Sequence, residues 1–194
     1  LTRIVENFSA EQLDDLLSRE YHYVQLIRRR IRELGHAYCR QQFDRDLDLD
    51  RIGVEPRYQL PAHIAPGSTT ASITKSLYEK EGRLNGFEER VINDVANLAS
   101  VQFWTRNPER TGFCLNGFLN HYPDFLIRTK AGRVVVLETK GDDRDNSDSE
   151  HKLYLGKTWA QKAGREYRYF MVFDSQRMDG AHTLTEFLEI LAQL

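Results

Sequence analysis

The sequence has few of the features that mark secreted, membrane-bound or zinc-finger proteins. Only two cysteines occur among its 194 residues, Cys39 and Cys114, and they are too far apart for a metal-ligand motif. Two thiols in a chain of this size are typical of reduced cytosolic proteins, so we expect a cytoplasmic location. No apolar run approaches the roughly 20 residues that span a bilayer, and no secretion leader is recognisable. These absences predict a protein without a membrane partner.

The sequence also lacks an excess of charge of either sign. Its net charge is −2 and its isoelectric point is near 6.3, whereas a protein that grips nucleic acid by itself usually has a basic surface. Basic residues cluster locally at 28–32 and at 152–168. Each cluster is typical of a solvated helix face, and a domain can also depend on a neighbouring domain to bind nucleic acid. Charge alone therefore decides nothing about a nucleic-acid partner.

The first half of the chain is mainly helical and connecting sequence. Residues 10–42 carry apolar residues at three- and four-residue intervals, which predicts a helix with a packing face, and Gly35 is a candidate point of division. Ser9 and Gln12 have the spacing of a capping box at its start. Residues 44–75 hold three of the five prolines and predict an irregular connector. We expect residues 1–75 to form a helical annex with its connector.

The second half, residues 76–194, is expected to be the main domain. A helical pattern covers residues 76–103, interrupted near Gly82–Gly86. The expected strands then cover 113–119, 122–129, 133–139 and 167–173. The later expected helices cover 151–165 and 183–193, and the acidic stretch 141–150 is expected to be a mobile loop. This order predicts the α/β class, with a mixed sheet covered by helices.

A three-residue loop before Arg133 predicts the register of a β-hairpin. If Thr129 faces Arg133 across this loop, Asp124 faces Glu138 on the neighbouring strand. Lys140 lies two residues beyond Glu138 and therefore projects from the same face of the sheet. One end of the hairpin would then present two carboxylates and an ammonium within a few ångströms.

Such an arrangement is costly for a hairpin with a purely structural role, because like charges directly opposite one another destabilise a sheet. A divalent cation would resolve the conflict. Mg²⁺ takes hard oxygen ligands, usually one or two carboxylates plus water and substrate phosphate, and Mn²⁺ is expected to substitute. We therefore predict a metal site at Asp124 and Glu138, where Lys140 orients an attacking water or neutralises charge on a phosphate.

Pro123-Asp124 followed by Glu138-Thr139-Lys140 resembles the motif of the PD-(D/E)xK nuclease superfamily. The resemblance implies a restriction-endonuclease-like α/β core, a mixed sheet flanked by helices, here preceded by an N-terminal helical annex. It also implies a glutamate on the first core helix that reaches the metal. Glu88 and Glu89 are both candidates, and periodicity favours Glu88 because it borders the buried stripe. The alternative is that these charges end a strand by chance after a Pro-Asp turn.

A longer series of motifs, spanning roughly residues 55–175, is similar to the carboxy-terminal nuclease domain of type III restriction enzyme subunits and related helicase-nuclease fusions. The shared motifs are Leu77-Tyr78, Asn85-Gly86-Phe87-Glu88, Trp104-Thr105-Arg106-Asn107, Tyr122-Pro123-Asp124-Phe125, Glu138-Thr139-Lys140-Gly141, Lys157-Thr158-Trp159 and Tyr169-Phe170-Met171-Val172-Phe173.

The resemblance implies DNA as substrate, an upstream ATP-driven helicase domain, and a methyltransferase or specificity subunit as partner. No phosphate-binding Gly-x-x-x-x-Gly-Lys-Ser/Thr loop occurs in these residues, so we do not expect this chain to bind ATP by itself. Leu1 in place of an initiating methionine is expected of a segment from a longer polypeptide, although a trimmed start would look the same.

Each of the further candidate site residues could instead have a purely structural role. The residues that could contact substrate or brace the site are Trp104, Arg106, Asn107, Lys157 and Trp159. A tryptophan in such a pattern is more often part of the core, and a lysine on a helix is often only solvated. His121 is a candidate second base, although a histidine at a strand end is usually incidental. None of the six histidines pairs with another at a zinc-ligand spacing.

These observations predict a metal-dependent endonuclease domain that hydrolyses DNA phosphodiester bonds. Its predicted catalytic residues are Asp124, Glu138, Lys140 and Glu88, and the three carboxylates among them are the predicted metal ligands. The competing hypothesis is a non-catalytic module for binding nucleic acid or docking a protein. RNA is a further candidate substrate, because no residue distinguishes the two sugars.

Overall fold

The structure is a computed structural model that describes residues 8–141, 146–175 and 178–194. The chain forms two compact units, Leu1–Ile52 and Gly53–Leu194. The two compact units divide at residue 52, whereas the sequence analysis includes the connector up to residue 75 with the helical annex. Residues 53–75 belong to the second unit because they bond to it: the Tyr78 hydroxyl donates to the Pro61 carbonyl at 2.5 Å.

The first unit consists of two helices, α2 (Ala10–Ser18) and α3 (Glu20–Asp48). The predicted capping box is confirmed, because Ser9 accepts a hydrogen bond from the Gln12 amide and Gln12 accepts one from the Ser9 amide. The division predicted at Gly35 is wrong. The helix breaks at Arg19, whose φ and ψ of −119° and 26° are not helical. A glycine inside a helix costs about 1 kcal/mol but need not end it.

The apolar stripe of α3 is not buried within this unit. Tyr21, Ile27, Ile31, Leu34 and Tyr38 are all exposed, although their spacing is that of a packing face. Arginines 28–30 and Arg32 lie in the same stretch and are exposed too, as expected for a solvated basic face.

The second unit is built on a mixed five-stranded sheet with the order β1-β4-β5-β6-β7. Its strands are β1 (Val101–Arg106), β4 (Phe125–Thr129), β5 (Val134–Lys140), β6 (Tyr167–Phe173) and β7 (His182–Thr183). β1, β4 and β5 are antiparallel, and β5, β6 and β7 are parallel. A separate short ladder joins β2 (Leu115–Asn116) to β3 (Asn120–His121).

The β4–β5 hairpin has the predicted register. Phe125 pairs with Leu137 and Arg128 with Val134, and the Thr129 amide donates to the Arg133 carbonyl at 2.9 Å. Gly132 in the loop has a φ of +84°, a conformation that glycine adopts without strain. The strand pairing ends at Phe125, so Asp124 lies directly before β4 rather than within it.

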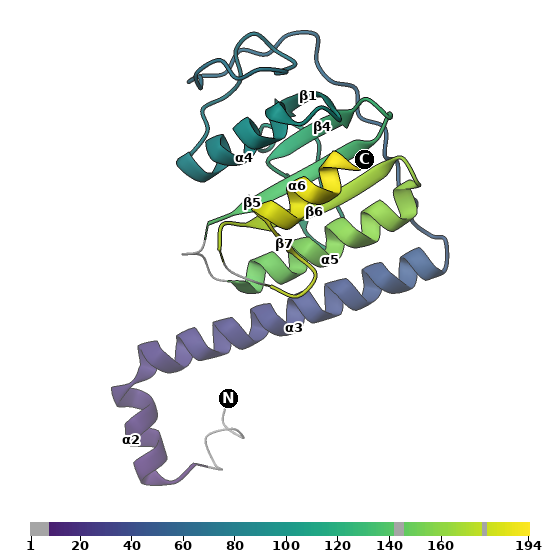
Figure 1. Ribbon diagram of the computed structural model, residues 1–194. Coiled ribbons are helices and arrows are strands. Elements are labelled where there is room, and N and C mark those ends of the chain that lie inside the picture. The colour runs from purple at the N-terminus through teal and green to yellow at the C-terminus, as the bar shows by residue number, and fades with distance from the viewer. Residues whose placement is uncertain (1–7, 142–145, 176–177) are drawn as a thin grey trace. The chain divides into compact units, whose positions relative to one another are not determined.

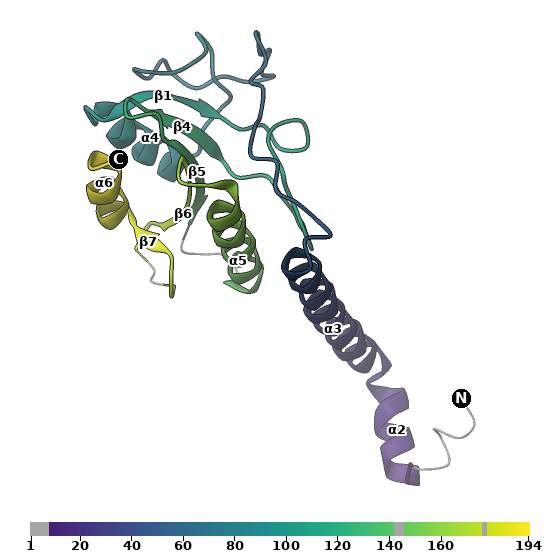
Figure 2. The same cartoon turned by 90° about the vertical axis from the view of Figure 1, so that its right-hand side faces the viewer.

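Helices cover both faces of the sheet (Figures 1 and 2). α4 (Gly86–Asn97) and α6 (Leu184–Ala192) pack on one face, where they bury the main core with Val135 and Leu137 of β5. α5 (Asn146–Ala163) connects the parallel strands β5 and β6 and covers the other face. Side chains alternate along a strand, so Val136, Glu138 and Lys140 face the α5 side.

Two predicted elements are wrong in part. The helix predicted over 76–103 is confined to α4, because Asn85 caps its start and residues 101–106 form β1. The Leu77 amide donates to the Trp104 carbonyl at 2.8 Å and the Trp104 amide donates to the Lys75 carbonyl at 2.9 Å, which holds residues 75–77 beside β1. The strand predicted over 113–119 is reduced to the two residues of β2.

The remaining predictions of secondary structure agree better with the structure. The strand expected over 167–173 is β6, and the helix expected over 183–193 is α6, which Thr183 caps. The acidic stretch 141–150 lies partly outside the described residues, and α5 already begins at Asn146, earlier than the expected 151.

The predicted α/β class is confirmed: N-terminal helices precede a mixed sheet flanked by helices. None of the described helices is long and apolar enough to cross a bilayer.

The close contact between α5 and the sheet can be tested at Gly156. A Cβ at this position would meet the ring of Tyr169, which is buried on β6. We expect Gly156→Ala to destabilise the fold by about 1–3 kcal/mol in urea unfolding, because the added methyl overpacks the interface. Gly86→Ala, on α4 with no atom within 4 Å of the added carbon, is the control and should change stability by less than about 1 kcal/mol. Equal effects would contradict this packing.

Candidate active site

A polar cleft of about 590 Å³ lies at the end of the β4–β5 hairpin where β5 ends. Residues from the start of α4, from β1 and the loop after it, from β3 and the β3–β4 connection, and from β5 and α5 line it. They are Asn85, Phe87, Glu88, Arg106, Asn107, Glu109, Asn120, Tyr122, Asp124, Glu138, Thr139, Lys140, Gly141 and Lys152. The predicted carboxylates Asp124, Glu138 and Glu88 are therefore neighbours of one cleft, together with Lys140.

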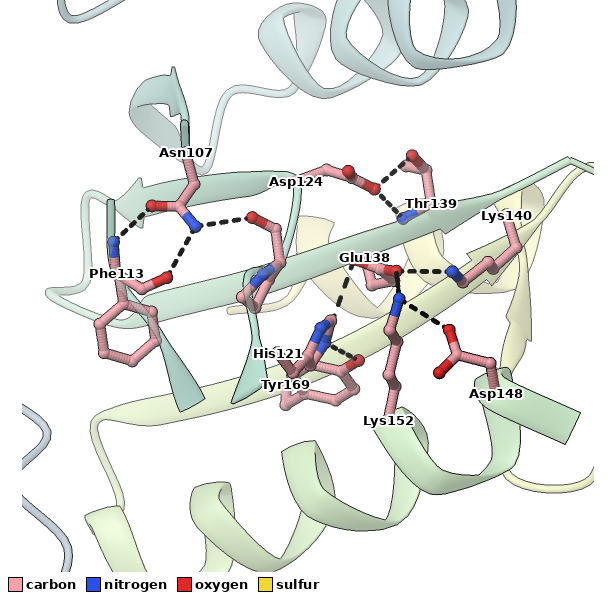
Figure 3. Close-up of polar contacts among 11 residues, drawn as sticks. Asn107, Phe113, His121, Asp124, Glu138, Thr139, Lys140, Asp148, Lys152 and Tyr169 are labelled. Atoms are coloured by element: carbon pink, nitrogen blue, oxygen red, sulfur yellow. Dashed lines mark hydrogen bonds and ion pairs between the residues drawn. The ribbon is translucent and has the colours of Figure 1, made fainter. Parts of the chain in front are cut away.

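Asp124 is held in place by the strand opposite it. Its Oδ2 accepts one hydrogen bond from the Thr139 amide and one from the Thr139 hydroxyl, both at 2.7 Å (Figure 3). Oδ1 accepts none from the described residues. The register predicts that Asp124 faces Glu138, but its carboxylate binds the next residue, whose side chain projects from the other face of the sheet. This difference arises because the ladder ends at Phe125, so the strand register does not set the direction of the Asp124 side chain.

Glu138 and Lys140 project from one face of the sheet, as the two-residue spacing predicts. Lys140 Nζ lies 2.8 Å from Glu138 Oε1, and both side chains are buried, with 6% and 5% of their surface exposed. Lys140 thus neutralises part of the charge that the strand carries into the interior. A buried carboxylate without such a partner would be strongly destabilising.

Burial controls the ionisation of both carboxylates. Desolvation, with a smaller contribution from the charge of Asp124, raises the pKa of Glu138 to about 7, although Lys140 and Lys152 oppose this shift. Desolvation also raises the pKa of Asp124, against the two hydrogen bonds from Thr139. Each carboxylate therefore holds its proton more tightly than an exposed one, and a nearby positive charge would favour ionisation of both.

Glu88, rather than Glu89, is the buried carboxylate of α4. Its Oε2 accepts a hydrogen bond from the Asn85 amide at 2.8 Å, which completes the capping box at the start of the helix. The same oxygen lies 2.8 Å from Nη1 of Arg106 at the end of β1. Glu88 therefore faces the cleft, but its Oε2 is already bonded to a helix cap and a guanidinium.

Arg106 and Asn107 lie at the cleft, and Trp104 does not. Arg106 donates to the Arg83 carbonyl at 2.7 Å as well as pairing with Glu88. Asn107 is buried and braces two loops, since its amide nitrogen donates to the carbonyls of Phe113 and Pro123, each at 2.8 Å. Trp104 is fully buried in the core, where its indole nitrogen donates to a backbone carbonyl. The core alternative for Trp104 is the one that the structure supports.

Lys157 and Trp159 also lie outside the cleft. Lys157 is exposed, and Trp159 is buried between the rings of Phe113 and Tyr167. His121 is buried with Nε2 2.9 Å from the Tyr169 hydroxyl. Burial lowers the pKa of His121 to about 3, so its neutral ring forms no ion pair with Glu138, 4.0 Å away. His121 is not among the residues that line the cleft, and its ring packs against that of Tyr169.

Lys152 lines the cleft, although the sequence analysis includes it only in the basic cluster at 152–168 and not among the site residues. Its Nζ lies 2.9 Å from Asp148, one turn earlier on α5, and 3.8 Å from Glu138 Oε1 (Figure 3). Burial tends to lower the pKa of Lys152, but the hydrogen bond to Asp148 and the charge of Glu138 outweigh it and raise that pKa. The four-residue spacing of Asp148 and Lys152 was a detectable signal. Nothing in the sequence showed that this pair faces Glu138.

The donor set of the cleft fits a divalent cation that takes only part of its ligands from protein. Among the described residues, no three histidine, cysteine, aspartate or glutamate side chains form a complete metal-binding group. Mg²⁺ commonly binds one or two carboxylates and fills its other positions with water and phosphate, and Asp124 and Glu138 could supply those two. In comparisons with known proteins, no family profile, curated protein or solved structure matches the chain.

The raised pKa of Glu138 predicts a dependence of stability on pH. The folded state binds the proton of Glu138 more tightly than the unfolded chain, so this stabilisation is full below about pH 4.5 and is lost as pH rises through about 7. Without metal, we expect the unmodified protein to lose about 3 kcal/mol relative to Glu138→Gln between pH 4.5 and pH 8. Urea unfolding of both proteins in a chelator, across this range, measures the difference. A difference that does not change with pH would show that Glu138 ionises like an exposed glutamate.

Proposed function

We propose that the second unit is a metal-dependent nuclease domain of restriction-endonuclease-like fold that hydrolyses DNA phosphodiester bonds. The observation that carries this proposal is the pair of carboxylates on Asp124 and Glu138, with Lys140 bonded to Glu138, in a polar cleft at the end of one hairpin. A structural role explains this group poorly, because two desolvated carboxylates at one strand end destabilise the fold.

The proposed ligands of the cation are Asp124 and Glu138. Thr139 fixes Asp124 through Oδ2 and leaves Oδ1 facing no donor of the described chain. Glu88 supports the site from α4, where it also anchors Arg106. When bound, Mg²⁺ would lower the pKa of a water molecule and polarise a phosphoryl oxygen.

The protein's own groups supply positive charge around the same point. Lys140 places an ammonium group beside Glu138, where it can orient an attacking water or neutralise charge that develops on the phosphate. Arg106, at the end of β1, lines the same cleft with a side chain that is 28% exposed and can contact a substrate phosphate. Asn107 does not need to touch substrate, because it holds together the loops that carry Asp124.

DNA is the proposed substrate, and the resemblance to type III restriction subunits supports a larger setting. In that setting an ATP-driven helicase domain belongs to the same polypeptide, and a methyltransferase or specificity subunit is the partner. Such partners would also supply the electrostatic affinity for DNA that a chain with a net charge of −2 does not provide.

Metal binding is the first test of this proposal. Titration calorimetry should show that Mn²⁺ binds the unmodified protein and that Asp124→Asn abolishes binding, because the substitution removes one of two ionised ligands. Glu109→Gln is the matched control, since Glu109 lines the same cleft but is exposed and pairs with Arg110. Loss of binding in both variants would point to a general effect of charge, and no binding by the folded, unmodified protein would reject the site.

Cleavage of a labelled DNA duplex tests the role of Lys140. We expect Lys140→Ala to lower the cleavage rate by roughly two to three orders of magnitude, because it removes one electrostatic stabiliser of the transition state. Lys130→Ala, an exposed lysine in the hairpin loop, is the control and should cleave normally. Circular dichroism must show both variants folded. A rate for Lys140→Ala within twofold of the unmodified protein would remove Lys140 from the mechanism, and DNA binding without metal or cleavage would favour a non-catalytic module.

A further inference from the structure

The cleft places two lysines on one carboxylate oxygen. Nζ of Lys140 lies 2.8 Å and Nζ of Lys152 lies 3.8 Å from Oε1 of Glu138. They approach from different elements, since Lys140 follows Glu138 on β5 and Lys152 comes from α5 (Figure 3). One carboxylate oxygen therefore faces two ammonium groups, and the more distant of them, on Lys152, also pairs with Asp148 at 2.9 Å.

The two lysines differ in what else they can reach. Lys140 is almost fully buried, with 6% of its side chain exposed, and Glu138 is its ion-pair partner among the described residues. Lys152 is 23% exposed, lines the cleft and has a second partner in Asp148, whose side chain is 63% exposed. Lys152 can thus leave Glu138 and remain paired at the edge of the cleft.

We infer that Lys152 is a phosphate-binding residue of this site, released from Glu138 when a divalent cation binds there and kept at the cleft by Asp148. The inference rests on the proposed function. A cation at Asp124 and Glu138 would repel an ammonium on the same carboxylate oxygen, because like charges at such distances interact strongly when solvent is excluded. Lys152 is the lysine with a second partner, so it is the one that moves.

The anion that substrate brings into the cleft is a phosphodiester group, which is the chemistry that a freed ammonium binds. A lysine binds phosphate as a point charge and reads no base, so this contact would hold the backbone without adding sequence preference. Asp148 lies one turn before Lys152 on the same helix and limits how far the ammonium can move away. Lys152 would therefore affect the binding of substrate more than the rate of the bound complex.

Three measurements on Lys152→Met, which keeps a long apolar stem, test the inference. In Ca²⁺, a short DNA duplex should bind the variant about tenfold more weakly than the unmodified protein, and the slope of log K against log salt concentration should be smaller by about one. In EDTA, the two proteins should bind the duplex with nearly equal affinity. Mn²⁺ should bind the variant at least as tightly, because a competing ammonium is gone. In Mg²⁺, KM should rise more than kcat falls. Lys162→Met, an exposed lysine in the last turn of α5, is the matched control and should change none of these.

The outcomes separate this inference from the proposed function. If the unmodified protein binds Mn²⁺ but Lys152→Met binds DNA in Ca²⁺ with unchanged affinity and salt slope, Lys152 only neutralises Glu138 and the inference fails alone. Equal loss of DNA affinity in EDTA and in Ca²⁺ would contradict release by the cation. If the unmodified protein binds no Mn²⁺, the proposed function and this inference fail together. Recovery of DNA affinity by Lys152→Arg, which keeps the charge, would support a direct phosphate contact.

Discussion

The burial of Glu138 is the constraint on which the rest of the site depends. This carboxylate lies at the end of an apolar strand with 5% of its side chain exposed, where an isolated charge would be too costly to retain. Two features of the structure lower this cost. The ammonium groups of Lys140, from the same strand, and Lys152, from α5, lie close to the carboxylate, and its raised pKa favours the neutral, protonated form. Under the proposed function, a divalent cation would replace the bound proton and part of the lysine charge.

The elements around Glu138 are tied to the same point by separate polar contacts. Thr139 fixes Asp124 across the hairpin, and the pair between Arg106 and Glu88 joins β1 to the first turn of α4. Asn107 holds two loops with three buried hydrogen bonds. Unpaired polar groups at such depth are expensive, so these contacts position the cleft accurately as well as stabilising it. The walls of the cleft are therefore fixed by the chain's own hydrogen bonds and ion pairs.

The sequence predicted the hairpin well and the elements before it poorly. The hairpin followed from local rules, because loop length and the two-residue period of a strand set the register of Phe125 through Arg133. β1 was mistaken for the end of a helix, since Val101, Phe103 and Trp104 satisfy a helical spacing as well as a strand. Its true state depends on hydrogen bonds to β4 on one side and to residues 75–77 on the other. Such long-range pairing leaves no mark in a short stretch of sequence.

The sequence by itself determined that Glu138 and Lys140 share one face of a strand and that Asp124 precedes the strand that pairs with theirs, because these relations follow from backbone geometry alone. Only the tertiary structure decided where each side chain is bonded. It turned Asp124 toward Thr139, engaged Glu88 with Arg106, placed Trp104 and Trp159 in the core and brought Lys152 to Glu138. The reason is physical: periodicity fixes the direction of a side chain, whereas its partner depends on which distant element packs against it.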